Sequence, residues 1–178
     1  MMINLVLVHY PCVDKNHDTV ATAAFPLDVQ DIARSCATFG VKRFFVVHPE
    51  PRQREFLQSV VDFWAKEEAR QWNESRSVAL ELVEILPSLE ALLEKISNPL
   101  LVTTSASLNP EKNIIFSDLK KITSDPDREI LLILGTGYGL HKSVFEQSAL
   151  QLEPIYGASN YNHLSVRSAA AIILSRLI

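Results

Sequence analysis

Apolar segments of two different periods alternate along this chain, and that alternation constrains the fold more than any other feature. Short continuous apolar runs rich in β-branched residues predict buried strands, whereas apolar residues spaced three and four positions apart predict helices. The six strands expected on this basis are 3–9, 44–47, 82–86, 100–103, 129–134 and 152–156. Strands that alternate with helices are typical of an α/β fold with a mainly parallel sheet and helices on both faces.

Helical periodicity and end signals predict helices between these strands. Asp28 lies just before an apolar stripe that Gly40 closes, so a helix with Asp28 at its start and a C-terminal glycine is expected. The stretch 78–82 fits either a helix or a strand. The last segment, 165–178, is apolar on most sides, and such a helix is buried all round, in the core or against a partner. Further helices are expected at 57–71, 89–96, 117–122 and 141–149.

Length and composition limit the classes of protein. With 178 residues, 47% of them hydrophobic and 21% charged, the chain suits one ordinary domain, expected to span 1–178. No apolar run approaches the roughly 20 residues that a membrane helix needs, so no membrane partner is expected. Cys12 and Cys36 have neither metal-ligand spacing nor the pattern of a disulfide framework, which favours a reducing, cytoplasmic location.

The net charge of −4 argues against binding of nucleic acid by the overall field of the protein. An RNA partner would therefore need local phosphate contacts. The available basic residues are Arg34, Lys42, Arg43, Arg52, Arg54 and Lys142. His9, Asp14 and His17 lie close together in the sequence, but without a second cluster of ligands no metal is expected.

Three loops follow predicted strands at positions where parallel α/β sheets bind ligands, outside the carboxyl ends of the strands. They are 103–106 with the sequence TTSA, 135–139 with the sequence GTGYG, and 157–163 ahead of the last helix. The glycines at 135–139 allow backbone amides to approach a ligand closely, although a purely structural turn has the same pattern.

The glycine loop does not match the common nucleotide-binding motifs. Leu140 occupies the sixth position, where the dinucleotide fingerprint has glycine, and no Gly-Lys-Ser/Thr of a P-loop follows. Taken singly, the polar residues in and just after the third loop have ordinary interpretations: Asn162 fits a turn residue, His163 an ordinary loop histidine and Ser165 an N-cap. Because the third loop combines these groups and follows two other candidate loops, the sequence predicts a pocket.

The motifs together resemble the SPOUT superfamily of knotted RNA methyltransferases. The pair GTGYGL and YNHLSVRSAAAIILSRL carries the resemblance, and VLVHYPCVDKNHDTVATA, LDVQDIARSCATFGVKRFFVVHP, LLVTTSA and LEPIYG extend it over the whole chain. More narrowly, the chain is similar to bacterial S-adenosyl-L-methionine (SAM)-dependent RNA methyltransferases related to the C-terminal region of some tRNA guanine-N1 methyltransferases. The resemblance implies methyl transfer from SAM to a base or ribose of a structured RNA, tRNA or rRNA.

The same resemblance implies further structural features. A C-terminal deep trefoil knot is expected, in which the last segment threads through a loop, together with an obligate homodimer that buries a second face of the last helix. The threonines after the fourth strand would line the adenine and ribose of SAM, the glycines its amino-acid and ribose side, and the third loop would supply backbone amides and carbonyls. These implied cofactor-binding positions are Thr103, Thr104, Gly135, Gly137, Gly139, Ile155, Asn162 and Leu164.

Three residues are implied as catalytic. The run IARSCATFGV resembles the first motif of the 2′-O-methylating branch, whose arginine, here Arg34, acts at the dimer interface beside the acceptor; by residue type alone Arg34 is a surface helix residue. Ser165 matches the serine of that branch's third motif, and His163 stands where the branch has asparagine.

The chemistry gives these residues their expected roles. An acceptor that loses a proton needs a base or a cation. The His163 imidazole suits the first role and the Arg34 guanidinium the second. Asn160 replaces the aspartate expected before Tyr161 in the nearer family, which removes one candidate base. The ring of Tyr138 or Tyr161 could form a cation–π contact with the SAM sulfonium, but the sequence does not favour this role.

Two other functions stay open. A non-catalytic SAM- or RNA-binding knotted module would have the same pocket without a competent base, and turnover distinguishes it from an enzyme. A Rossmann-type nucleotide enzyme would need the acidic partner and the glycine spacing that this chain lacks, and ligand identity distinguishes it.

Overall fold

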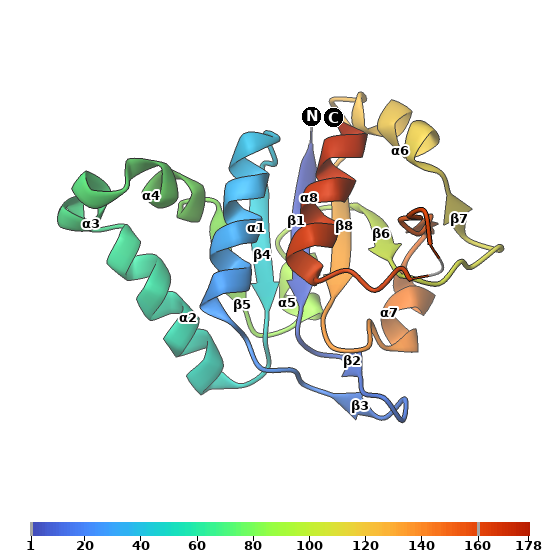
Figure 1. The fold of residues 1–178 in the computed structure, drawn as a ribbon, viewed down its shortest axis with the longest axis horizontal. Helices are drawn as coiled ribbons and strands as arrows, with labels where there is room; N and C mark the ends of the chain where they lie inside the picture. The colour runs from blue at the N-terminus through green and yellow to red at the C-terminus, as the bar shows by residue number, and fades with distance from the viewer. Residues whose placement is uncertain (1, 160) are drawn as a thin grey trace.

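The computed structural model describes residues 2–159 and 161–178, and a central parallel sheet organises them (Figure 1). The strand order is β5-β4-β1-β8-β6-β9-β7, and every pairing in this sheet is parallel. The strands are β1 Ile3–Val8, β4 Arg43–Val47, β5 Val83–Leu86, β6 Leu100–Thr104, β7 Asn113–Ile114, β8 Ile130–Gly135 and β9 Leu150–Leu152. The predicted α/β class and mainly parallel sheet are thus confirmed.

The sheet has seven strands, so the expected number of six is wrong. The additional strand, β7, is only two residues long and pairs with β9 at the edge of the sheet. A pair of residues carries too little apolar pattern to predict a strand, and its pairing depends on a partner distant in sequence. The last predicted strand also lies earlier than expected. It covers 150–152 instead of 152–156, because the chain leaves the sheet after Leu152.

Helices cover both faces of the sheet. One apolar core cluster lies between the sheet and residues of α1, α2, α4, α6 and α8, and a second lies between the opposite face and α5 and α7. The stretch 78–82 is the end of α4 followed by a turn into β5. The helices are α1 Pro26–Thr38, α2 Pro51–Trp64, α3 Glu67–Trp72, α4 Glu74–Leu80, α5 Leu89–Leu93, α6 Phe116–Thr123, α7 Lys142–Gln147 and α8 Val166–Leu177.

Helix α1 begins earlier than its sequence signals predicted. Phe25 is the N-cap residue and makes no side-chain capping bond, so the expectation that Asp28 starts the helix is wrong. Pro26 begins the helix instead, because the fixed φ of proline is already helical and the first helical N–H needs no partner. Asp28 lies in the first turn and pairs with Arg167 of α8 at 3.3 Å. Gly40, with φ +68°, ends this segment as expected.

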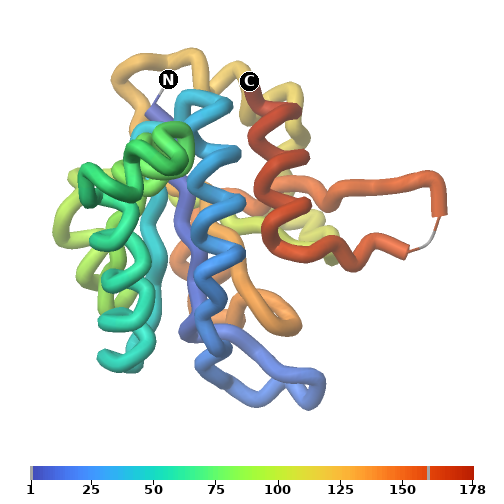
Figure 2. The backbone as a smooth tube through the Cα atoms, turned by 60° about the vertical axis from the view of Figure 1, so that its left-hand side comes forward, coloured from blue at the N-terminus to red at the C-terminus, as the bar shows by residue number. Residues whose placement is uncertain are grey.

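Helix α8 is buried on one side only. Ala170, Ile173 and Leu174 lie in the core. Ala171 and Ile172 are half-buried, so the expectation that this chain's own core buries the helix all round is wrong. The other alternative, burial against a partner, stays a prediction. Figure 2 shows α8 beside α1, and the two are linked by the Arg167 ion pair.

A small hairpin lies at the end of the sheet where the parallel strands finish. Its strands, β2 Cys12–Val13 and β3 Thr19–Val20, pair antiparallel and follow β1 directly. The Val13 amide donates to the Gly139 carbonyl at 3.0 Å, so the hairpin is joined to the glycine loop. In the described part of the chain, no helix is long and apolar enough to cross a membrane.

Candidate functional site

The three candidate loops lie at one edge of the sheet because the strands before them are parallel neighbours. We call this the carboxyl edge, and name the loops after β6, β8 and β9 loop 1 (105–112), loop 2 (136–141) and loop 3 (153–159 and 161–165). Strands β6 and β8 are adjacent, and β9 lies on the other side of β6. The fold therefore brings together segments that are up to 60 residues apart in the chain.

Side-chain hydrogen bonds tie loop 3 and its strand to loop 1. Asn162 Nδ2 donates to the carbonyl oxygen of Ala106 at 2.8 Å. Gln151, buried in the middle of β9, donates through Nε2 to the carbonyl oxygen of Ser107 at 2.7 Å. Backbone carbonyls of an irregular loop need such partners when water is excluded. These two amides therefore fix the course of loop 1 beside loop 3.

The three glycines in and before loop 2 are required for different physical reasons. A Cβ on Gly135 would meet Leu140 N at 2.7 Å, so the turn closes too tightly for a side chain. Gly137 and Gly139 have φ +63° and +113°, which side chains rarely tolerate. A Cβ on Gly137 would also meet Thr22 at 3.0 Å, whereas space beside Gly139 is open.

The two threonines at the end of β6 point to opposite faces of the strand. Thr103 is fully buried, and its hydroxyl lies 3.2 Å from Ser148 Oγ and donates to the Leu150 carbonyl at 3.3 Å. Its side chain thus holds β9 against β6. Thr104 is half-buried and its hydroxyl donates to the Ile133 carbonyl of β8 at 3.1 Å. Of the two side chains, only that of Thr104 is partly accessible at the carboxyl edge.

Loop 3 leaves main-chain groups unused. The amides and carbonyls of Ile155, Asn162 and Leu164 form no hydrogen bond with the part of the chain that the structure describes. Ile155 is anchored by packing of its side chain against the larger core cluster. Such groups are able to bind a ligand by main-chain hydrogen bonds while the side chains hold the loop in place.

A buried polar network that sequence reasoning missed lies under loop 2. His9 is fully buried directly after β1, and its Nδ1 lies 2.9 Å from Thr22 Oγ1. That hydroxyl also contacts the hydroxyl of Thr136, which donates to the Val8 carbonyl at 3.1 Å. The network therefore joins Thr136, the first residue of loop 2, to Thr22, which follows the β2–β3 hairpin. The sequence signal that could have indicated this network is a histidine directly after an apolar run, which occurs at His9 and again at His48.

Burial determines the charge state of these histidines. Burial, helped by the neighbouring His48, lowers the pKa of His9 to about 4. Burial also lowers the pKa of His48, against the effect of its hydrogen bond to the Thr22 carbonyl. Nε2 of His9 has no hydrogen-bond partner among the described residues. Both rings are thus held uncharged at neutral pH, which suits a structural network better than proton transfer.

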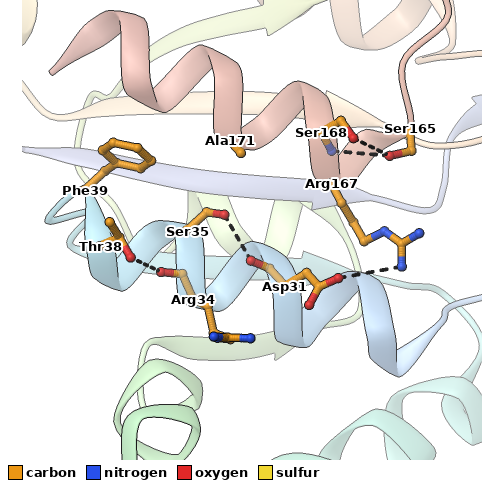
Figure 3. A pocket seen from close by; sticks show the side chains of 9 residues that line it. All are labelled: Asp31, Arg34, Ser35, Thr38, Phe39, Ser165, Arg167, Ser168 and Ala171. Carbon is orange, nitrogen blue, oxygen red and sulfur yellow. Dashed lines mark hydrogen bonds and ion pairs between the residues drawn. The ribbon is translucent and has the colours of Figure 1, made fainter.

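A groove of about 680 Å³ lies between α1 and α8 (Figure 3). Arg34 and Ser165 both line it, but the guanidinium of Arg34 is turned away from Ser165 in this view. Arg167 crosses the groove to Asp28 at 3.3 Å and Asp31 at 3.7 Å. Burial raises the pKa of Asp28, and the positive charge of Arg167 opposes that shift.

The three predicted catalytic residues are not gathered at one point. Ser165 caps α8 by accepting a hydrogen bond from Ser168 N at 3.3 Å, as its N-cap alternative predicted. His163 is exposed on loop 3, with its ring 5.6 Å from that of Tyr161. Arg34 is exposed on α1. Asn160, named as the replacement for a family aspartate, lies outside the described residues.

The basic residues named as phosphate contacts are distributed over both ends of the sheet. Lys42 and Arg43 lie at the start of β4, away from the carboxyl edge, and Lys42 pairs with Glu129 at 3.1 Å. The guanidinium of Arg54 donates to the carbonyls of His48 and Pro49. Lys142 begins α7 directly after loop 2 and lies closest in sequence to the candidate site. Among the described residues, no group of three or more His, Cys, Asp or Glu side chains is arranged to hold a metal.

A family model described as SAM-dependent RNA methyltransferase matches residues 2–178. This chain belongs to that family. An uncharacterised protein of Aquifex aeolicus is 36% identical over 99% of the chain and 90% of its own length. A tRNA (guanine-N(1)-)-methyltransferase of Nitratidesulfovibrio vulgaris is also 36% identical over 97% of the chain, which spans only 41% of that relative's length.

The methyltransferase family assignment agrees with the fold. The SpoU methyltransferase AviRb of Streptomyces viridochromogenes, solved with its cofactor AdoMet, superposes with a TM-score of 0.61 and 15% identity, covering 98% of this chain and 56% of that one. A methylase family protein of Haemophilus influenzae gives a TM-score of 0.66 at 16% identity, over 98% and 64% of the two chains. The chain therefore shares the fold of these methyltransferases. The family model confirms the resemblance to SAM-dependent RNA methyltransferases found in the sequence.

The carboxyl edge fits the cofactor that this methyltransferase family uses. Gly139 leaves open space where a side chain would stand, so a ligand can approach the backbone of loop 2. Loop 3 offers unused amides and carbonyls on the other side of β6. A cofactor with adenine, ribose and amino-acid parts needs many polar contacts of this kind, and SAM is the cofactor of the family.

Proposed function

We propose that this methyltransferase modifies a base or ribose of tRNA or rRNA, with its reaction centre at the carboxyl edge. The observation that carries the proposal is the junction of loops 1 and 3 through Asn162 and Ala106, next to a glycine loop with an open backbone. Support for tRNA comes from the relative that acts as a tRNA (guanine-N(1)-)-methyltransferase. The chain matches less than half of that protein, so the whole relative's substrate is carried over only as a proposal.

Loops 1, 2 and 3 would hold SAM mainly through the main chain. Thr104 and the end of β6 would line the adenine and ribose, the glycines of loop 2 the amino-acid side, and Ile155, Asn162 and Leu164 would donate and accept through backbone groups. Thr103 would act indirectly by fixing β9. SAM supplies a methyl group on a positively charged sulfur. The protein's contribution is position and exclusion of water.

His163 is the proposed base for the acceptor, since it is exposed on loop 3 next to the main-chain groups assigned to SAM. Arg34 would stabilise the developing negative charge or bind a phosphate of the RNA. Ser165 would act by position, because its side chain caps α8 and thereby fixes the end of loop 3. The guanidinium of Arg34 is turned away from Ser165 of its own chain, so we propose that Arg34 acts on the site of a second copy.

The proposed assembly is a homodimer formed across α1 and α8. Half-buried Ala171 and Phe39 line the groove between these helices, and Phe25 and Leu27 are exposed at the start of α1. A second copy would bury this surface and bring its Arg34 to the neighbouring site. A deep trefoil knot formed by the segment after β9, a single domain over 1–178 and a cytoplasmic location complete the proposal. The fold that the chain shares with the methyltransferase AviRb agrees with this proposal.

Methyl transfer from radiolabelled SAM to RNA tests the proposal. The substrates are total tRNA and rRNA from cells that lack this gene, so that the target position is unmodified. We expect label in one RNA class at one nucleotide, identified by nuclease digestion and mass spectrometry. Binding of SAM without transfer to either class would favour the non-catalytic module, and binding of NAD in place of SAM would overturn the SAM site.

A further inference from the structure

All four tyrosines of this chain are exposed, and all four lie at the carboxyl edge. Tyr10 follows β1 and is 43% exposed, and Tyr138 in loop 2 is 72% exposed. Tyr156 and Tyr161 in loop 3 are 62% and 72% exposed. Tyrosine elsewhere in a fold usually buries its ring and finds a partner for its hydroxyl. Packing in the core therefore does not explain why the tyrosines are concentrated at a single edge.

The fold places the segments that carry Tyr10 and Tyr138 next to one another, and the strands that precede all four tyrosines are neighbours. The His141 amide donates to the Pro11 carbonyl and the Tyr138 amide to the Val13 carbonyl, both at 3.1 Å, which joins the segment after β1 to loop 2. Strands β1, β8, β6 and β9 are consecutive in the sheet. At a strand spacing of about 4.8 Å, the four strand ends span about 15 Å, roughly the length of a few nucleotides.

The tyrosine hydroxyls do not stabilise the described structure by hydrogen bonds. In residues 2–159 and 161–178, none of the four has a hydrogen-bond partner. Among the described residues, the one ring that a tyrosine contacts is that of exposed His163, whose centroid lies 5.6 Å from that of Tyr161. Rings that are exposed and have few contacts are free to bind a ligand without disturbing the core.

Exposed aromatic rings beside an RNA-modifying site recognise unpaired bases. Sequence-tolerant stacking on aromatic side chains is how proteins bind single strands and loops, whereas the stacked bases of an A-form duplex are not accessible to them. The net charge of −4 leaves phosphate contacts to a few local residues. Affinity for RNA must then come to a large extent from the bases.

We infer that the four tyrosines form a stacking platform that binds unpaired nucleotides, so that the RNA substrate presents its target in a loop or single-stranded segment. This inference rests on the proposed function, because it assumes that RNA approaches the carboxyl edge. It assigns a substrate class, unpaired RNA, and residues that bind it. Tyr138 and Tyr161 are the most exposed of the four and are the main stacking residues.

Fluorescence anisotropy of a labelled oligouridylate of about a dozen nucleotides tests the platform, since single-strand sites cover about 4–16 nucleotides. We expect Tyr138→Ala and Tyr161→Ala each to weaken binding by about 5- to 100-fold, the range for loss of one stacked base. Tyr138→Phe and Tyr161→Phe keep the ring and should bind within about twofold of the unmodified protein. The logarithm of the affinity should fall with the logarithm of salt with a slope shallower than about −3, because few phosphates are neutralised.

Trp72→Ala is the matched control. Trp72 is 73% exposed, as Tyr138 and Tyr161 are, but lies on α3 far from the carboxyl edge (Figure 1), and its removal should leave RNA binding unchanged. Titration with S-adenosylhomocysteine verifies that each tyrosine variant keeps its cofactor site. Unchanged RNA binding by both alanine variants, or equal binding of a duplex of the same length, would overturn the platform. Failure of the unmodified protein to bind S-adenosylhomocysteine would instead overturn the proposed function.

Discussion

Asn162 and Ala106, 56 residues apart in the chain, are joined by a hydrogen bond of 2.8 Å from the Asn162 side chain to the Ala106 carbonyl. The bond connects the loops after β6 and β9, which are adjacent strands. It is a direct polar link between the end of loop 3 and loop 1. Together with the bond from Gln151 to the Ser107 carbonyl, it fixes the course of loop 1 beside loop 3, where we propose that the cofactor binds.

Replacement of Asn162 should weaken cofactor binding. Asn162→Ala removes the donor, and Asn162→Asp keeps the shape without it. Because a typical hydrogen bond contributes about 1 kcal/mol net, we expect S-adenosylhomocysteine to bind about fivefold more weakly to both variants in calorimetric titration. Asn16→Ala, in the exposed turn of the β2–β3 hairpin, is the control and should bind normally. Normal affinity in both Asn162 variants would show that loop 1 keeps its course without this bond.

Gly139→Ala should reduce both stability and cofactor affinity. At φ +113° a side chain strains the backbone by about 1–3 kcal/mol and occupies the open space beside loop 2. Gly40→Ala is the matched control, because Gly40 also has a positive φ, +68°, but lies after α1, away from the three loops. Urea denaturation should show a loss of stability in both variants, and titration a loss of affinity in Gly139→Ala alone. Equal affinity in the two variants would exclude loop 2 from the cofactor site.

The buried histidine should make folding depend on pH. The pKa of His9 is about 4 in the folded protein and near 6.5 when exposed. Between these values the unfolded chain binds a proton that the folded chain does not. The contribution of uncharged His9 to the free energy of unfolding is therefore fully present above about pH 6.5. It falls as pH decreases towards 4, by about 3 kcal/mol at most. The lowered pKa of His48 acts in the same direction.

Urea denaturation between pH 4.5 and 7 measures this dependence. His9→Gln should unfold with a shallower dependence of its free energy of unfolding on pH than the unmodified protein. His17→Asn, at an exposed turn with φ +66°, keeps a residue that tolerates this conformation and should retain the full slope. Identical slopes for His9→Gln and the unmodified protein would show that folding does not lower the pKa of His9.

Arg34→Ala should impair methyl transfer without impairing cofactor binding. Loss of a group that stabilises developing charge costs about 10²- to 10³-fold in rate. Arg34→Lys should recover part of the loss, since it keeps the charge but not the planar fork of donors. Arg128→Ala, exposed at the opposite end of the sheet, is the control. Full methylation of a proven RNA substrate by Arg34→Ala would refute the interface role of this arginine.

The proposed dimer makes Ala171 a sensitive position. Ala171 is half-buried in the groove between α1 and α8, so Ala171→Arg would place an unpaired charge in the interface. Light scattering should show dimers for the unmodified protein and monomers for this variant. Ser175→Arg changes an exposed residue of the same helix and should leave the mass unchanged. A monomeric unmodified protein would remove the basis for the role of Arg34 between two copies.

The position of the candidate site was largely predictable from sequence, because the apolar runs that form buried strands can be recognised there. The runs that end near Thr103 and Gly135 are apolar enough to be recognised as buried strands, and ligands of parallel sheets bind after such runs. The strand before loop 3 was expected at 152–156, so its presence was predicted but its end was not. The buried network of His9, Thr22 and Thr136 was not predictable. Its members come from three separate segments, and no spacing along the chain relates them.

The sequence by itself determined the alternation of strands and helices, the glycine turn and the family, because these depend on local periodicity and contiguous motifs. Three features follow only from the tertiary structure: the seventh strand, the hydrogen bond from the Thr103 hydroxyl to β9 and the ion pair of Asp28 with Arg167. Each of these depends on which distant segment becomes a neighbour. That choice is made by burial and hydrogen bonding of the whole chain, so local signals do not encode it.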